Sequence, residues 1–119
     1  MPILVVDDNE DLAESLAEIL HSEFPSHELS VGHDGEHALR LAEAHRPRVV
    51  VMDLEMPVMG GVAAAREMRR RMPEPPKLTL IAMTGNPAAA NTDDAREAFD
   101  HLLDKPVDID RLLRLVAAA

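Results

Sequence analysis

Short apolar runs alternate with amphipathic stretches along this chain of 119 residues. Ile3 to Val6 is a continuous and partly β-branched apolar run, which is typical of a strand buried on both faces. Further short stretches predict strands over residues 28–32, 49–52, 78–83 and 102–103. The run at 49–52 is the clearest of them because it is rich in valine. The pattern therefore predicts five short strands.

Between these runs, apolar residues recur every three or four positions, as they do on one face of a helix. This spacing predicts helices over residues 9–21, 34–46, 62–72 and 108–118. Pro47 ends the second of them, and the third ends at Pro73, Pro75 and Pro76. Asp108 is a suitable N-cap for the last helix.

The segment from Pro87 to Phe99 has a weaker pattern, because its apolar content is nearly all alanine. Alanine favours helix but buries little area. The run Asn91-Thr92-Asp93-Asp94 offers a second N-cap inside the segment. We therefore expect a short or mobile helix here, with marginal docking onto the rest of the fold.

Each predicted strand is followed by a predicted helix, with connections of only a few residues. Helical crossovers join parallel strands, and right-handed crossovers on both faces give an open, doubly wound α/β sheet. Ligands of such sheets bind beyond the carboxyl ends of the strands. The residues that follow each strand are therefore the first candidates for chemistry.

Length and composition fit one compact domain over residues 1–119. The absence of cysteine excludes thiol chemistry and disulfides. The first residues lack the features of a signal peptide, and no apolar run approaches the roughly 20 residues that span a bilayer. We therefore expect a cytoplasmic protein with no membrane partner. A net charge of −10 and only two aromatic residues argue against direct nucleic-acid binding.

Polar residues follow four of the predicted strands: Asp7 and Asp8 the first, Asp53 the third, Thr84 the fourth and Lys105 the fifth. Carboxylates about 4 Å apart repel by roughly 4 kcal/mol at an effective dielectric near 20. Protonation or a cation must offset that repulsion, and an all-oxygen set suits Mg²⁺. A carboxylate is also a nucleophile towards a phosphoryl group, whose three oxygens the metal, Lys105 and Thr84 would contact.

Four blocks of the sequence, in this order and spacing, resemble the receiver domain of response regulators in bacterial two-component systems: Val5-Val6-Asp7-Asp8-Asn9, Met52 to Gly61, Met83-Thr84-Gly85 and Lys105-Pro106. The resemblance covers essentially the whole chain. It implies a flavodoxin-like fold with five parallel strands in the order 2-1-3-4-5, and a cis peptide bond between Lys105 and Pro106. Residues 99–107 are most similar to receivers attached to hybrid sensor kinases.

The same resemblance implies roles for the acidic residues. Asp53 would accept a phosphoryl group from a phosphohistidine on a sensor histidine kinase or a histidine phosphotransfer domain. Mg²⁺ would be ligated by Asp8, by Asp53 and by the main-chain carbonyl of Glu55, with Asp7 acting through water. The chain would be a signalling switch rather than an enzyme, catalysing only its own phosphorylation and dephosphorylation. A weak dimer is compatible with this class.

Thr84 and Lys105 would contact the phosphoryl group. One residue near them departs from the usual family pattern, and two others occupy positions that vary within the family. Receivers commonly have an aromatic residue or histidine three positions before the lysine, where it moves together with the threonine. Here that position is Leu102, which leaves relay through an aromatic switch open. Glu55 and Asn86 occupy positions that tune the phosphoryl lifetime in the family, in either direction.

Other readings of these residues stay open. The acidic run at residues 7–9 is also a good N-cap for the first helix, and Thr84 alone would be an ordinary turn residue. A phosphohydrolase of the haloacid-dehalogenase type also uses Asp, Thr, Lys and Mg²⁺. Its nucleophile lies in an Asp-x-Asp motif after the first strand, whereas Asp53 follows the third and has Glu55 two residues later. An interaction module that has lost phosphorylation is a third reading. The complete set of the acidic pair, Asp53, Thr84 and Lys105 argues against it, while Leu102 keeps it open.

Overall fold

Five parallel strands form one sheet in the order β2-β1-β3-β4-β5. The computed structural model describes residues 2–75 and 77–119, so Pro76, one of the prolines predicted to end the third helix, lies outside the described residues. The strands are β1 (Ile3–Val6), β2 (Leu29–Gly32), β3 (Val49–Asp53), β4 (Thr79–Thr84) and β5 (His101–Asp104). The predicted doubly wound α/β sheet and its strand order are confirmed.

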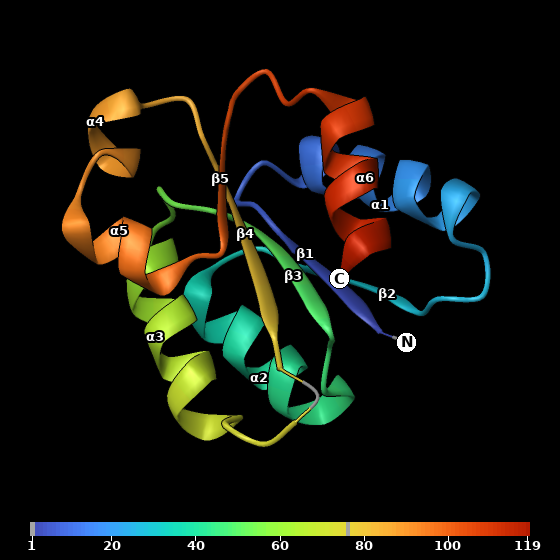
Figure 1. Ribbon diagram of the computed structural model, residues 1–119, viewed down its shortest axis with the longest axis horizontal. Coiled ribbons are helices and arrows are strands. Elements are labelled where there is room, and N and C mark those ends of the chain that lie inside the picture. The colour runs from blue at the N-terminus through green and yellow to red at the C-terminus, as the bar shows by residue number, and fades with distance from the viewer. Residues whose placement is uncertain (1, 76) are drawn as a thin grey trace.

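Helices cover both faces of this sheet, with α1 and α6 on one face and α2 and α3 on the other (Figure 1). The helices in the described residues are α1 (Glu10–Glu23), α2 (Gly35–His45), α3 (Gly61–Arg71), α4 (Pro87–Ala90), α5 (Asp93–Ala98) and α6 (Ile109–Ala118). Asn9, Asp34 and Asp108 cap α1, α2 and α6 by accepting a main-chain N–H, as short polar side chains do at helix starts. No helix among the described residues combines the length and the apolar character needed to cross a bilayer.

The continuous apolar runs of the central strands reflect burial on both faces. In β3, Val50 and Met52 pack into the core under α2 and α3, while Val49 and Val51 pack into the core under α1 and α6. Successive side chains of a strand point to opposite faces, so a strand covered on both sides needs apolar residues at every position. Burial at all positions of β1 and β3 follows from this.

The expectation of one helix between Pro87 and Phe99 needs correction, because the structure has two short helices there, α4 and α5. The Thr92 hydroxyl accepts the Ala95 N–H at 3.0 Å and so begins α5 as a separate helix. No residue of α4 is buried, whereas α5 buries Ala95 and Ala98. Alanine side chains bury too little area to hold one long helix against the sheet, so an internal N-cap is enough to divide the segment.

Candidate functional site

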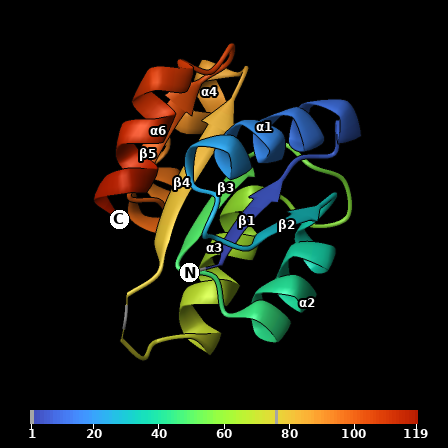
Figure 2. The ribbon, with the colours of Figure 1, turned by 90° about the vertical axis from the view of Figure 1, so that its right-hand side faces the viewer.

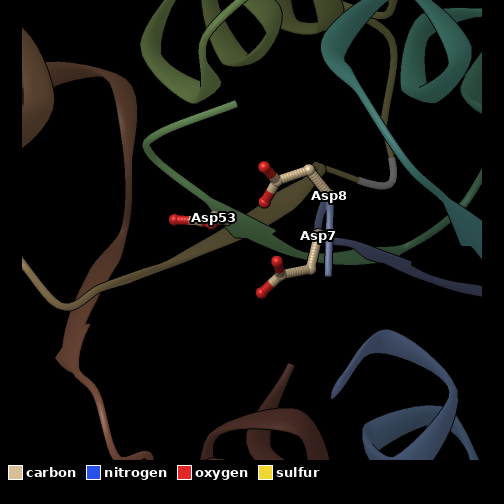
Figure 3. Close-up of side chains that lie close together, drawn as sticks. All are labelled: Asp7, Asp8 and Asp53. Atoms are coloured by element: carbon tan, nitrogen blue, oxygen red, sulfur yellow. The ribbon is translucent and has the colours of Figure 1, made fainter. Parts of the chain in front are cut away.

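The predicted acidic residues meet at the carboxyl edge of the sheet. Val6 of β1 pairs with Met52 of β3, which places Asp7 and Asp53 side by side at the strand ends. Carboxylate oxygens of Asp7, Asp8 and Asp53 lie within 4.8 Å of one another. Figure 3 shows the three carboxylates extending to the same side of the two strands. Asp7 and Asp53 are buried, and Asp8 is exposed.

Lys105, which follows β5, lies between two of these carboxylates. Its Nζ donates to Asp7 Oδ2 at 2.8 Å and to Asp53 Oδ2 at 3.2 Å. The side chain reaches them past the end of β4, which separates β5 from β3 in the sheet. The predicted cis peptide bond between Lys105 and Pro106 is confirmed. One ammonium group therefore offsets part of the repulsion in the acidic cluster.

A recurring turn fixes three of the predicted site residues at their strand ends. Asp7 Oδ1 accepts the N–H of Asn9 at 2.9 Å, and Asp53 Oδ1 accepts the N–H of Glu55 at 3.1 Å. Thr84 Oγ1 accepts the N–H two residues later in the same way, at 3.0 Å. Short polar side chains commonly make such bonds to the main chain two residues on. Sequence reasoning missed this turn, although the residue types that follow the strands are a recognisable signal for it.

The electrostatics of the cluster shift two pKa values. Burial raises the pKa of Asp53 above its ordinary value, with a further contribution from the Asp7 charge, and together they outweigh the Glu55 N–H and Lys105, which lower it. Burial alone would lower the pKa of Lys105, but the hydrogen bond to Asp7 and the charges of both carboxylates outweigh it and raise that pKa. Lys105 is therefore fully charged at neutral pH.

The loop between β3 and α3 approaches the end of β3 closely. A Cβ on Gly61 would lie 2.4 Å from the main-chain oxygen of Asp53, so only glycine allows α3 to begin there. In the same loop, Val58 adopts a left-handed backbone with φ of 69° and is 76% exposed. A β-branched residue is disfavoured in that region. Nothing in the hydrophobic pattern pointed to this conformation of Val58.

A cavity of about 390 Å³ opens beside the acidic cluster and is lined by Asp53, Glu55, Gly85, Asn86 and Lys105. The structure thus brings Asp53 and Lys105 to one opening. Glu55 and Asn86, which the family resemblance placed beside the acceptor, flank this opening. Thr84 is placed differently. It is 2% exposed, and its hydroxyl bonds with the N–H and carbonyl oxygen of Asn86, at 3.0 and 3.2 Å.

The donor set fits a hard divalent cation. Two oxygens on opposite sides of Mg²⁺ lie about 4.2 Å apart, twice its usual bond length, which is close to the 4.8 Å that bounds this cluster. Asp8 makes no side-chain hydrogen bond or ion pair within residues 2–75 and 77–119, so it is free to ligate. Asp7 is different, because one oxygen accepts from Asn9 and the other from Lys105.

Leu102 of β5 is half-buried and packs against the core under α2 and α3. Ala89 and Ala90 of α4 pack against the same core. The residue in place of the family's aromatic group therefore packs against the same core as α4.

This sheet carries an oxygen-rich acidic cluster and a half-buried lysine at its carboxyl edge. Such an arrangement is suited to handling phosphoryl groups. The family model described as "Response regulator receiver domain" matches residues 3–117. The chain belongs to this family, and it is a receiver domain of two-component signalling. Receiver domains are signalling switches with intrinsic autodephosphorylation, and they bind Mg²⁺ at an acidic pocket.

Three similar proteins illustrate the match. A response regulator receiver protein from Anaeromyxobacter sp. strain Fw109-5 is 38% identical over 94% of this chain and 45% of its own length. A protein-glutamate methylesterase/protein-glutamine glutaminase from Vibrio parahaemolyticus is 36% identical over 92% of this chain and 30% of its own length. The crystal structure of response regulator TrrA from Thermotoga maritima, in complex with Mg²⁺ and BeF, covers 98% of this chain and 96% of its own, with 29% identity and a TM-score of 0.85. The chain therefore spans less than half the length of either of the first two relatives.

Proposed function

We propose that this chain accepts a phosphoryl group on Asp53 from a phosphohistidine of a histidine kinase or a histidine phosphotransfer domain. An oxygen of the Asp53 carboxylate would form the new P–O bond while the P–N bond of the phosphohistidine breaks and the imidazole leaves. The observation that carries the proposal is the placement of Lys105, whose Nζ lies 3.2 Å from Asp53 Oδ2 at the mouth of the cavity.

Mg²⁺ is the proposed cofactor, held by Asp8, Asp53 and the main-chain carbonyl of Glu55. The hydrogen bonds of Asp7 to Asn9 and Lys105 support a water-mediated role for that residue. When bound, the cation supplies positive charge that offsets the carboxylates and the incoming phosphoryl oxygens. Lys105 would supply a second positive charge on the side of the cavity formed by the end of β5.

Switching would begin at Thr84. Its hydroxyl is now bonded to both main-chain polar groups of Asn86, and Asn86 Oδ1 caps α4 through the N–H of Ala88 at 3.0 Å. Because the Thr84 hydroxyl has one proton, donation to a phosphoryl oxygen would replace the bond that it donates to the Asn86 carbonyl and so loosen the start of α4. Because α4 has no fully buried residue and touches the core through the small side chains of Ala89 and Ala90, a shift of this helix would expose little apolar area.

The experiment is phosphorylation by a small acyl phosphate, which needs no protein partner. With acetyl phosphate and Mg²⁺, the intact mass of the chain should increase by one phosphoryl group. Asp53→Asn should stay unmodified, while the matched control Asp104→Asn, changed at an exposed position at the end of β5, should be modified like the wild type. Modification of Asp53→Asn at the wild-type rate would show that the acceptor is another residue. Turnover of many equivalents of a generic phosphate ester would instead favour a phosphohydrolase.

A further inference from the structure

The larger of the two cavities that stand out in the described residues lies at the amino edge of the sheet, opposite the acidic cluster. It has a volume of about 440 Å³, within the roughly 300–1,000 Å³ of typical small-molecule sites. Pro2, Pro47, Met72 and Leu78 supply its apolar walls. They come from the start of the chain and from the connections that follow α2 and α3, which lie at the same end of the molecule (Figure 2).

Main-chain hydrogen bonds hold the walls of this cavity together. The N–H of Arg48 donates to the carbonyl oxygen of Pro2 at 2.9 Å, and the N–H of Thr79 donates to the carbonyl oxygen of Arg48 at 2.9 Å. The three segments around the cavity are therefore tied to the starts of β1, β3 and β4. A site built on strand starts is better ordered than one built on free loops.

Two arginines, Arg46 and Arg48, belong to the lining. Within the part of the chain that the structure describes, neither forms an ion pair, although the chain carries a net charge of −10. The arginines of α3 are different, since Arg66, Arg69, Arg70 and Arg71 all pair with carboxylates. The lining contains one carboxylate, Glu74. The cavity therefore has a net positive charge over an apolar floor.

The backbone of Arg46 adds an independent observation. Arg46 follows α2 in a left-handed conformation with φ of 49°, and its N–H donates to the carbonyl oxygen of Ala42. Glycine or asparagine is favoured at such a position, and another residue costs about 1 kcal/mol. No ion pair within the described residues offsets that cost. Breaks of a local rule of this kind gather at functional sites, and this one lies at the cavity.

We propose that this cavity binds a small monocarboxylate with an apolar body. Arg46 and Arg48 would receive the carboxylate, because a guanidinium donates two parallel hydrogen bonds to a planar pair of oxygens. The apolar body would lie against Pro47, Met72 and Leu78. Glu74 disfavours a more highly charged anion such as inorganic phosphate. The site is separate from the acidic cluster and does not depend on the proposed phosphorylation.

Octanoate is a suitable probe, used below the concentration at which it forms micelles, with NMR of the methionine methyl groups as the readout. We expect saturable shifts at Met72 with an affinity in the millimolar range or tighter. Three further compounds separate the features of this probe. Octanol lacks the charge, octyltrimethylammonium carries the opposite charge, and inorganic phosphate lacks the apolar body. Each should bind at least about tenfold more weakly, as the loss of a charge-assisted contact implies. Unsaturable shifts, or equal binding of octanol, would overturn the proposal.

Variants separate the arginines from general apolar adhesion. Arg48→Gln and Arg46→Asn should each weaken octanoate binding about tenfold, and asparagine at position 46 suits the left-handed backbone, so the fold is kept. Arg114→Gln on α6, also an exposed arginine, is the matched control and should bind like the wild type. If both lining variants bind octanoate unchanged, the assignment is wrong. Asp53→Asn should bind octanoate like the wild type, because Asp53 is not part of this cavity. A failure of the phosphorylation proposal would therefore leave this result unchanged.

Discussion

Replacing Lys105 with methionine tests how the acidic cluster is stabilised without metal. The ammonium lies 2.8 Å from Asp7 Oδ2 and 3.2 Å from Asp53 Oδ2. Methionine keeps most of the apolar stem and removes the charge. In the variant, the buried carboxylates would keep only their main-chain N–H partners, from Asn9 and Glu55.

The expected loss follows from burial. Removing one partner of a buried ion pair costs about 3–5 kcal/mol, because a charge is left uncompensated. Asp7 and Asp53 have side chains only 1% and 8% exposed, but that of Lys105 is 24% exposed, so part of its charge is already screened by water. We therefore expect a loss near the lower end, about 3 kcal/mol of unfolding free energy without metal. Saturating Mg²⁺ should reduce the loss to below about 1 kcal/mol, because the cation compensates the same carboxylates.

Urea unfolding followed by far-UV circular dichroism measures both values, since the chain has no Trp or Tyr for fluorescence. Lys77→Met is the matched control, because Lys77 is 80% exposed and lies 3.9 Å from its partner Asp100. It should change stability by less than about 0.5 kcal/mol. The reasoning fails if Lys105→Met loses less than about 1 kcal/mol in a chelator, or if the loss is equal with and without Mg²⁺.

Two further predictions concern the β3–α3 loop and the start of β5. Val58 is exposed and adopts a left-handed backbone, which is strained for valine and tolerated by asparagine. Val58→Asn should therefore stabilise the fold by about 1 kcal/mol. An unchanged or lower urea midpoint would contradict this. Burial alone would raise the pKa of Asp100, but the Leu80 N–H and the Arg69 guanidinium outweigh it and hold that pKa below its ordinary 3.8. The ionised carboxylate therefore contributes stability that is fully present above the unfolded pKa and is lost as pH falls through the folded one. As the pH falls below about 4, the wild type should lose more stability than Asp100→Asn. Parallel thermal-melting profiles of the two proteins would refute the assignment.

The doubly wound sheet and its acidic edge could be predicted because they depend on local patterns, whereas the strand order came from the family resemblance. Apolar runs with no polar position identify strands covered on both faces, and parallel strands place the residues that follow them along one edge. Asp7, Asp8, Asp53 and Lys105 meet for that reason. Their identity as aspartates and lysine could be read directly, whereas their hydrogen-bond partners could not.

The remaining features depend on three-dimensional contacts that a local pattern does not encode. The division into α4 and α5 reflects how little area alanine buries, so an internal cap at Thr92 prevails. The Thr84 hydroxyl bonds with the main chain of Asn86, which the residue type alone does not reveal. Arg69 joins α3 to the carbonyl of Ala98 at 2.9 Å, a contact between residues far apart in the sequence.

The carboxylates at neighbouring strand ends repel one another, and we expect a divalent cation to bind because it relieves that repulsion. Calorimetric titration with Mg²⁺ measures this binding in the wild type, in Asp8→Asn and in Asp11→Asn. Asp11 is an exposed aspartate in the first turn of α1. We expect the wild type and Asp11→Asn to bind one Mg²⁺ per chain, and Asp8→Asn to lose binding. Equal binding by all three proteins, or no binding by the wild type, would contradict it.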